Sequence, residues 1–197
     1  EKGWLGGGNT GRNTMTVRSN FLREDSVPFH EMSLDLYHQL SRDLNYNLMV
    51  SQRGMITFIQ SSAANRVALQ MANTMHIYGA EYRMLTLDEV KQKIPIFDPS
   101  PDMRLPVRGG VYQPRASMVR HDAVAWGFAR AADARGVDII QNCEVTGIQQ
   151  ENGAVTGVET TRGLIKARKI GMAVAGHGSV VASMVGQRLP ITTQPLQ

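Results

Sequence analysis

The spacing of the apolar residues alternates along this chain between a helical and a strand-like period, and this alternation constrains the fold more than any other feature. Between residues 29 and 44 the apolar side chains recur at helical intervals, which predicts a helix that Ser26 could cap, with Pro28 in its first turn. Residues 47–59 instead predict two short strands, broken near Gln52-Arg53-Gly54. Helices that interleave with parallel-strand and hairpin patterns are typical of a mixed α/β chain.

Capping residues predict the bounds of two further helices. Ser61 or Ser62 could open a helix that extends to about Tyr78, where a glycine ends it. Thr86 and Glu89 have the spacing of a capping box, which predicts a short helix that a proline then stops. Residues 3–16, in contrast, are rich in Gly, Asn and Thr without a hydrophobic period, so we expect a loop there.

Turn residues separate the elements predicted in the second half of the chain. Residues 110–113 have a strand pattern, and Asp122 is a suitable N-cap for a helix that stops at Gly136. Residues 137–141 predict another strand. Asn152-Gly153 is the dipeptide favoured in two-residue hairpin turns, which predicts a hairpin around it.

Composition limits the classes of protein to which the chain can belong. Its 197 residues, 42% hydrophobic and 19% charged, fit one large or two small domains of an ordinary globular protein. No apolar run approaches the roughly 20 residues of a membrane-spanning helix, and the first residues lack the apolar core of a signal peptide. The single cysteine, Cys143, excludes an internal disulfide and a Cys-rich zinc site, so we expect a reducing, cytoplasmic compartment.

Charge and motifs exclude several functions. The net charge is +4, but the arginines are scattered, which argues against nucleic-acid binding. The excess suits binding of small anions such as phosphates or carboxylates, and it suits an ordinary solvated surface equally well. The sequence contains no P-loop, metalloprotease or hydrolase-elbow motif, and its five histidines do not have the spacing of metal ligands.

One turn near the end of the chain resembles a dinucleotide-binding turn. A strand predicted over residues 164–175 leads into Gly176-His177-Gly178, and a helix is predicted from Ser179. Val181 stands where the third glycine of the fingerprint is expected, so either a tight strand-to-helix turn or close approach to a ligand explains the pattern. Glu1, which precedes a Gly-rich loop, resembles the acidic strand end that binds a ribose hydroxyl in such folds.

The segments acquire a specific meaning when they are considered together. In order along the chain, they resemble the beta subunits of heterotetrameric sarcosine oxidases, which belong to the D-amino-acid-oxidase-like superfamily of flavoproteins. The segments that carry the resemblance are EKGWLGGGNTGRNT (1–14), VRSNF (17–21), SQRG (51–54), YQPRA (112–116), RHDAVAWGFARAA (120–132), VDIIQNCEVTGI (137–148) and TTRGLIKA (160–167). Both ends of the chain look cut, so we expect a fragment that lacks the N-terminal GxGxxG unit of the family.

The resemblance implies a fold, cofactors and partners. The fold would be part of an FAD-binding Rossmann-like domain with inserted substrate-domain elements, divided into an FAD-binding segment (1–45), a substrate and interface segment (46–120) and a second FAD-binding segment (121–197). Sarcosine would be oxidised at a non-covalent FAD, and electrons would pass through a covalent FMN to oxygen, which gives hydrogen peroxide. The implied partners are alpha, gamma and delta subunits of a heterotetramer, with neither nucleic acid nor membrane among them.

The resemblance also implies roles for individual residues. Arg18 and Arg120 are the catalytic candidates: Arg18 matches a position that pairs with a substrate carboxylate, and Arg120 stands where some relatives have a lysine that could assist oxygen reduction. Arginine keeps the charge but cannot readily exchange a proton, which puts that second role in doubt. His121 matches the histidine that carries the covalent FMN. The implied cofactor contacts elsewhere are Glu1, Lys2, Gly8, Asn9, Thr10, Arg12, Asn13, Thr14, Val145, Ala175, Gly176 and His177.

Simpler interpretations stay open at each of these positions. Without the resemblance, His121 reads as a capping or surface residue, Arg18 as a surface arginine, and residues 7–14 as a polar surface loop. The alternatives for the whole chain are a related FAD-dependent dehydrogenase of secondary amines or glycine derivatives, and a non-catalytic scaffold that binds subunits through its methionine-rich surface. The eleven methionines are compatible with the scaffold, although methionine more often fills a core.

Overall fold

The structure is a computed structural model that describes residues 1–194. The chain divides into two compact units, Asn13–Phe128 on the one hand and Glu1–Arg12 together with Ala129–Gln197 on the other. We call these the central unit and the terminal unit. Within the described residues, no helix is both long and apolar enough to cross a membrane.

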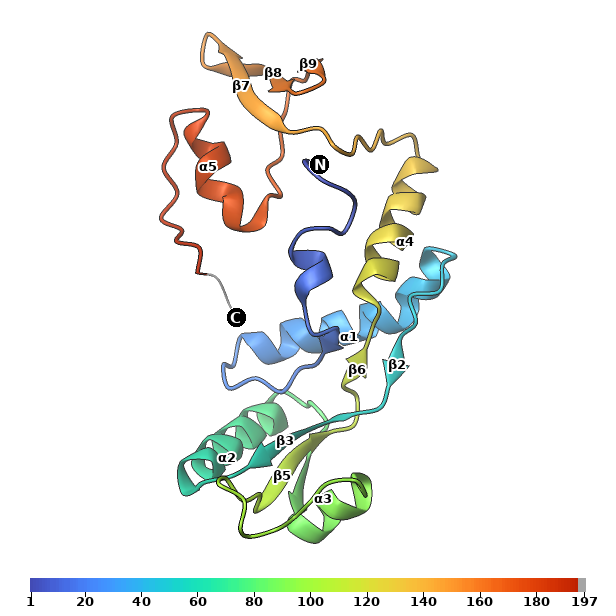
Figure 1. The fold of residues 1–197 in the computed structure, drawn as a ribbon, viewed down its shortest axis with the longest axis vertical. Helices are drawn as coiled ribbons and strands as arrows, with labels where there is room; N and C mark the ends of the chain where they lie inside the picture. Colours follow the sequence, from blue (N-terminus) through green and yellow to red (C-terminus); the bar gives the residue numbers. More distant parts are fainter. Residues whose placement is uncertain (195–197) are drawn as a thin grey trace. The chain divides into compact units, whose positions relative to one another are not determined.

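The central unit combines helices with two small antiparallel sheets (Figure 1). Its helices are α1 (Ser26–Asp43), α2 (Ser62–Ile77), α3 (Leu87–Lys93) and the start of α4 (His121–Asp133). One sheet has the order β3-β5-β4, with β3 (Met55–Ile59), β5 (Gly109–Gln113) and β4 (Arg83–Thr86). The other has the order β1-β6-β2, with β1 (Thr16–Val17), β6 (Ser117–Met118) and β2 (Ser51–Gln52).

The core of the central unit lies where α1 and α2 pack against the larger sheet. It consists of the buried side chains Val27, Ile59, Ala68, Met71, Met75, Ala80 and Val111. The helix α2 begins as predicted, because the Ser61 hydroxyl accepts a hydrogen bond from the Ala64 amide. The capping box predicted at Thr86 and Glu89 is also confirmed, with both of its reciprocal hydrogen bonds present.

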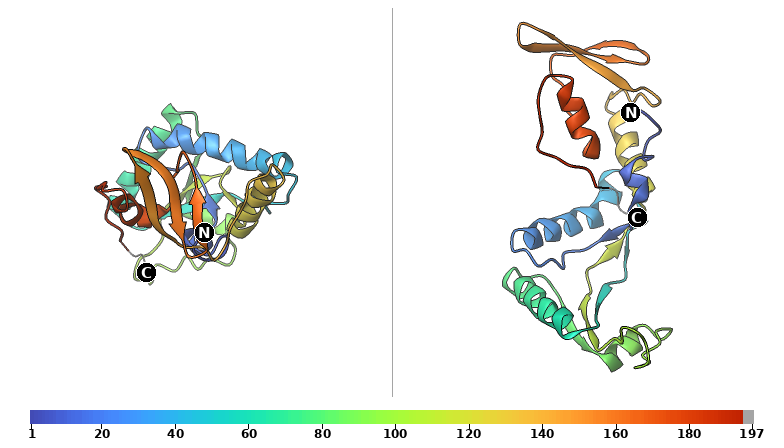
Figure 2. Two further views of the ribbon diagram at one scale, coloured as in Figure 1. Left: turned by 90° about the horizontal axis from the view of Figure 1, so that it is seen from above. Right: turned by 60° about the vertical axis from the view of Figure 1, so that its left-hand side comes forward.

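The terminal unit contains a three-stranded antiparallel sheet and short helical turns (Figure 2). Its elements are η1 (Asn9–Arg12), β7 (Val145–Glu151), β8 (Ala154–Thr160), β9 (Gly163–Lys166), η2 (Ala175–His177) and α5 (Gly178–Ser183). The hairpin predicted at Asn152-Gly153 is confirmed: both residues have positive φ, 51° and 78°, as a type I′ turn requires.

The structure corrects several boundary predictions. Residues 137–141 do not form a strand within the described chain; the next residues instead hydrogen-bond to the first three, with Asn142 N donating to Gly3 O and Cys143 N to Glu1 O. The strand predicted over residues 164–175 ends at Lys166, where β9 loses its pairing with β8. Asp122 lies inside the first turn of α4 rather than at its N-cap, because the helix already begins at His121.

The mixed α/β class is confirmed, but the parallel-strand patterns are not. Every strand pairing among the described residues is antiparallel. The physical reason is that a buried apolar run alone does not specify strand direction.

Candidate functional site

His121 is the first residue of α4 and follows the short strand β6 by two residues. Two backbone hydrogen bonds hold the residues between them: Val119 N donates to Met15 O (3.0 Å), and Arg120 N donates to Leu48 O (3.2 Å). The structure therefore brings the end of the Gly-rich segment, Asn13 to Thr16, to the residues that precede His121. These two regions of the predicted site are more than a hundred positions apart in the sequence and meet across β1 and β6.

The Nδ1 atom of His121 is buried and has no hydrogen-bond partner among the described residues. A buried polar atom without a partner costs about 1–3 kcal/mol, so such atoms in proteins usually meet a ligand or another group. The helix that carries this ring is packed closely at Gly127, where an added Cβ would meet Leu48 Cδ2 at 3.0 Å and Tyr46 Cδ1 at 3.2 Å. The ring therefore has a defined position and an unused nitrogen.

Arg120 and Asp122 flank His121 and form a two-pronged ion pair. Arg120 Nε lies 3.0 Å from Asp122 Oδ1, and Arg120 Nη2 lies 2.5 Å from Asp122 Oδ2. The hydrogen bond from Arg120 is the main cause of a lowered pKa of Asp122, and Asp122 in turn raises the pKa of Arg120. Because the folded-state pKa of Asp122 is lowered, the pair is fully formed above the carboxyl's ordinary pKa and is lost only as the pH falls below that value.

Arg18 lies in the central unit with one edge of its guanidinium occupied. Its Nη1 donates to the carbonyl (3.1 Å) and side-chain oxygen (2.8 Å) of Asn20, and the guanidinium lies over the Phe21 ring at 4.5 Å. Asn20 is itself held by Thr57, whose hydroxyl accepts from Asn20 Nδ2 at 3.1 Å. These contacts orient the group. Among the described residues they engage Nη1 and not Nη2 or Nε, which are the two donors that a carboxylate could bridge.

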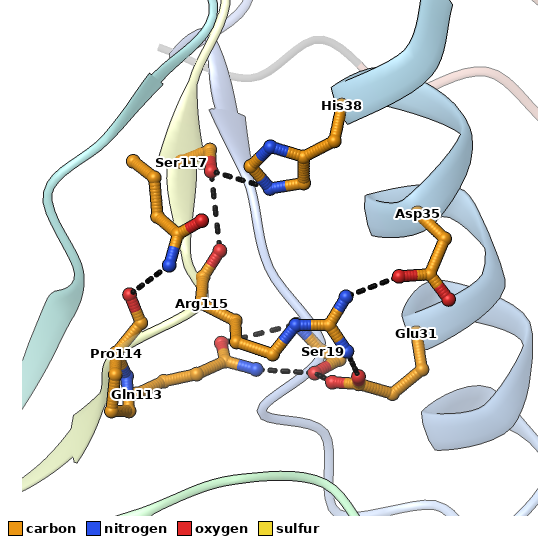
Figure 3. Close-up of polar contacts among 9 residues, drawn as sticks. Ser19, Glu31, Asp35, His38, Gln113, Pro114, Arg115 and Ser117 are labelled. Atoms are coloured by element: carbon orange, nitrogen blue, oxygen red, sulfur yellow. Dashed lines mark hydrogen bonds and ion pairs between the residues drawn. The ribbon is translucent and has the colours of Figure 1, made fainter.

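A buried polar network lies next to Arg18 and joins α1 to the strand segment that leads into β6 (Figure 3). Ser19 and Gln113 are fully buried. Ser19 N donates to Gln113 Oε1 (3.1 Å), Gln113 Nε2 donates to the Ser19 hydroxyl, and that hydroxyl donates to Glu31. Arg115 completes the network with one ion pair to Glu31 and another to Asp35.

This network fixes three segments together. Figure 3 shows Glu31, Asp35 and His38 on one side of α1, where they point toward the segment from Gln113 to Ser117. The Glu31 side chain is only 15% exposed and the Arg115 side chain 29%, so solvent screens their ion pair little. The network thereby fixes the backbone next to Arg18 relative to the start of β6.

The predicted FAD contacts of the terminal unit lie in two places. Glu1 and the loop up to Arg12 form the first; Glu1 Oε1 accepts a hydrogen bond from Gly3 N (3.0 Å), and Lys2 Nζ pairs with Glu144 at 2.7 Å. Asn9, Thr10 and Arg12 lie in the short helix η1, which is exposed. A Cβ at Gly8 would meet nothing within 4 Å, so the loop is open at that point.

The second place is the strand-to-helix turn with its neighbouring sheet. Ala175 has a φ of 47°, which is uncommon for a residue with a side chain, and it begins the turn that contains Gly176 and His177. Thr193 donates to the Gly176 carbonyl at 2.8 Å, which ties the turn to the last described residues. Val145 stands at the start of β7, partly exposed.

The resemblance names the segments of the predicted site but does not predict the contacts within them. It missed the roles of Ser19, Glu31 and Gln113, although Gln113 belongs to YQPRA, one of the segments that it quoted. It also missed that an Asn-x-Met sequence precedes each of the two strands that border β6, at residues 13–15 and 47–49. Within residues 1–194, the side chains do not form a cluster of three or more His, Cys, Asp or Glu that could hold a metal.

Comparisons with known proteins give a consistent result. Residues 1–197 match the family described as FAD dependent oxidoreductase. The chain is 49% identical over its whole length to sarcosine oxidase subunit beta of Rhizobium meliloti (strain 1021) and 47% identical to that of Arthrobacter sp, and it covers 47% and 49% of those proteins. The chain therefore spans about half the length of the curated relatives that it matches.

A solved structure supports the fold. L-proline dehydrogenase from P. horikoshii superimposes with a TM-score of 0.85 over 94% of this chain and 48% of that one, at 22% sequence identity. An identity this low shows that the two folds are alike and leaves the activity to be argued from the site.

Proposed function

This chain belongs to the family of FAD-dependent oxidoreductases, and we propose that in the complete protein it forms part of an oxidase that acts on sarcosine as the beta subunit of a heterotetramer. The proposal is supported by the relatives named above, each of which is called a sarcosine oxidase subunit and is 47–49% identical over the whole chain. The net reaction is oxidation of sarcosine to glycine and a formaldehyde-level one-carbon unit, while oxygen is reduced to hydrogen peroxide.

The observation that carries the proposal is the buried, unpartnered Nδ1 of His121. The resemblance predicts a covalent FMN on this histidine, and the ring fits that role because it has a nitrogen without a partner and a backbone held at Val119 and Arg120. Asp122 and Arg120 form an ion pair beside the ring, and the hydrogen bond from Arg120 lowers the pKa of Asp122, so this ion pair persists above the ordinary pKa of a carboxyl. When bound, the flavins supply the acceptor for a hydride equivalent from the N-methyl carbon and its delivery to oxygen.

The FAD is proposed to bind non-covalently through the residues that the resemblance implies. Glu1 has one carboxylate oxygen that the Gly3 amide does not use, and that oxygen is suited to accept from a ribose hydroxyl. Arg12 is an exposed cation in the Gly-rich segment and has the charge that a pyrophosphate needs. We propose Gly8, Asn9, Thr10, Asn13, Thr14, Val145, Ala175, Gly176 and His177 as further contacts.

Arg18 is proposed to bind the substrate carboxylate through the edge of its guanidinium that Asn20 does not occupy. Replacing Arg18 with lysine should raise the apparent KM for sarcosine about tenfold with little change in flavin content, because a point charge replaces a planar fork. Steady-state kinetics with flavin quantification measures both. An Arg23→Lys variant, altered at an exposed ion pair, is the matched control and should behave as the parent protein. An unchanged KM for Arg18→Lys removes this residue from the substrate site.

The proposed partners are the alpha, gamma and delta subunits that complete such an enzyme. Arg120, in contrast, is a weak candidate for proton transfer to oxygen, because its charge is engaged by Asp122 and a guanidinium does not readily release a proton. We assign it instead to holding the start of α4.

Peptide mapping tests the proposed function directly. The complete protein, purified with its partner subunits, is precipitated with acid and digested with trypsin, and the flavin-bearing peptide is sequenced. Because trypsin cleaves after arginine, the expected peptide begins at Ala116 or His121, ends at Arg130 and carries the flavin on His121. A flavin on His177, or no acid-stable flavin at all, rejects the assignment and favours a dehydrogenase of the same superfamily.

A further inference from the structure

We propose that Asn13 and Asn47 are a matched pair of positioning residues, which fix the backbone on both sides of β6 and thereby place His121. Neither residue was assigned this role by the sequence. The proposal deepens the proposed function and rests on it for what His121 carries. The backbone geometry itself can be tested without any flavin.

Both asparagines make the same local hydrogen bond. Asn13 Oδ1 accepts from Met15 N at 2.8 Å, and Asn47 Oδ1 accepts from Met49 N at 2.9 Å. Both methionines have a left-handed backbone, with φ values of 59° and 55°. A methionine rarely adopts this conformation unless its surroundings hold it there, and an asparagine that bonds the amide two residues on is such a constraint.

The two turns lead into two strands that pair with β6 in the same register. Thr16 and Ser51 both lie opposite Met118, and the residues after them both lie opposite Ser117. β6 is therefore the middle strand of a sheet whose two edges each begin with an Asn-x-Met turn. The same Asn-x-Met turn on both sides of the two-residue strand β6 indicates that the position of β6 is constrained from both sides.

The turns also set the two carbonyls that hold the chain just before His121. Met15 O accepts from Val119 N (3.0 Å), and Leu48 O accepts from Arg120 N (3.2 Å). The direction of the first carbonyl depends on ψ of Met15, and that of the second on the peptide plane shared with Met49. If Met15 relaxed to a right-handed or extended backbone, its carbonyl would turn away from Val119 N. If Met49 relaxed, the peptide plane that it shares with Leu48 would rotate, and the Leu48 carbonyl would turn away from Arg120 N.

The backbone before His121 matters because the proposed attachment of the flavin requires the imidazole ring to lie in one position. Its Nδ1 is buried without a partner among the described residues, and the close packing of α4 at Gly127 limits sliding of the helix. The position of the ring then depends on the backbone conformation of residues 119 and 120. Asn13 and Asn47 remove that freedom from opposite sides.

The first test measures amide exchange in the complete protein at single-residue resolution. Asn13→Ala should speed exchange of the Val119 amide about 5- to 10-fold, and Asn47→Ala should do the same for the Arg120 amide. Asn13→Asp and Asn47→Asp should stay near the parent rates, because a carboxylate oxygen still accepts the methionine amide. Asn73→Ala, at an exposed position of α2, is the matched control and should change neither amide.

The second test measures how fast acid-stable flavin forms on the apoprotein with added FMN. Both alanine variants should slow this step about fivefold or more, and Asn47→Asp should restore it. Unchanged exchange at Val119 and Arg120 in the alanine variants overturns the proposal, and so does faster exchange without slower flavin attachment. A parent protein that forms no acid-stable flavin refutes the role of His121 instead, and the exchange rates then decide the backbone claim alone.

Discussion

The complete protein with His121 replaced by alanine should contain no acid-stable flavin, while its fold and its non-covalent FAD stay largely intact. Covalent attachment needs a nucleophilic ring nitrogen at this position, and the nearest sequence neighbours offer none: the segment from Arg115 to Arg130 contains no other histidine and no cysteine. The fold should tolerate the change because alanine favours a helix start at least as well as histidine, and because the variant removes a buried nitrogen that lacks a partner.

The measurement separates the two flavins. Acid precipitation releases FAD into the supernatant and keeps a covalent flavin in the pellet, where its absorbance is read. Sarcosine should still reduce the FAD of the variant in the absence of oxygen, whereas turnover with oxygen should fall by at least a hundredfold. His177→Ala, altered in the strand-to-helix turn, is the control and should keep its acid-stable flavin. A yellow pellet from His121→Ala would falsify the assignment.

Much of the local structure could be predicted because its causes are local. The start of α2 needs only the Ser61 hydroxyl and an amide three residues on, and the capping box of α3 needs only Thr86 and Glu89. The β7–β8 hairpin follows from two residues, Asn152 and Gly153, that accept positive φ. In each case the physical cause lies within a few positions of its effect, so a single sequence contains it.

Elements that depend on a distant partner could not be predicted in the same way. Residues 137–141 have the apolar content of a strand, but a strand exists only where a neighbour offers a ladder of hydrogen bonds. Here a few backbone hydrogen bonds from this region to Glu1 and Gly3 take the place of a ladder. The same holds for the network around Gln113, whose partners come from α1 and from the segment after β1. Amino-acid composition and the spacing of apolar residues contain no information about contacts between segments that are far apart in the sequence.

The residues of the candidate site were predicted from the family resemblance and not from local sequence patterns. His121, Arg18 and Arg120 were singled out through the resemblance, and no property of their own spacing distinguishes them from ordinary surface residues. The structure adds that Arg120 is engaged by Asp122 and that Arg18 is stacked on Phe21. Asn13 and Asn47 show the opposite case: the Asn-x-Met sequence also occurs inside α2, at residues 73–75, so the copies at 13–15 and 47–49 acquire meaning only when they are seen to border one strand.

Replacing Gln113 with alanine should lower the free energy of unfolding by about 2–4 kcal/mol, the largest stability effect that we expect in the central unit. Gln113 is fully buried, and its amide both accepts from the Ser19 amide and donates to the Ser19 hydroxyl. Alanine leaves the Ser19 amide buried without a partner and leaves a cavity where the amide group was. Urea denaturation of the complete protein, followed by far-UV circular dichroism, measures the change.

A second substitution at the same position distinguishes hydrogen bonding from lost volume. Gln113→Glu keeps nearly the same size, but the Ser19 hydroxyl has one proton and would face two carboxylates, Glu31 and the new one. The glutamate variant should therefore be destabilised at least as much as the alanine variant at neutral pH and should recover part of the loss as the pH falls and a carboxyl is protonated. Gln92→Ala, at an exposed position of α3, should change stability by less than about 0.5 kcal/mol. If Gln113→Glu instead has the stability of the parent protein, then packing volume, and not the hydrogen bond that Gln113 Nε2 donates to the Ser19 hydroxyl, holds the Ser19 and Gln113 segments together. In that case the network does not orient Arg18.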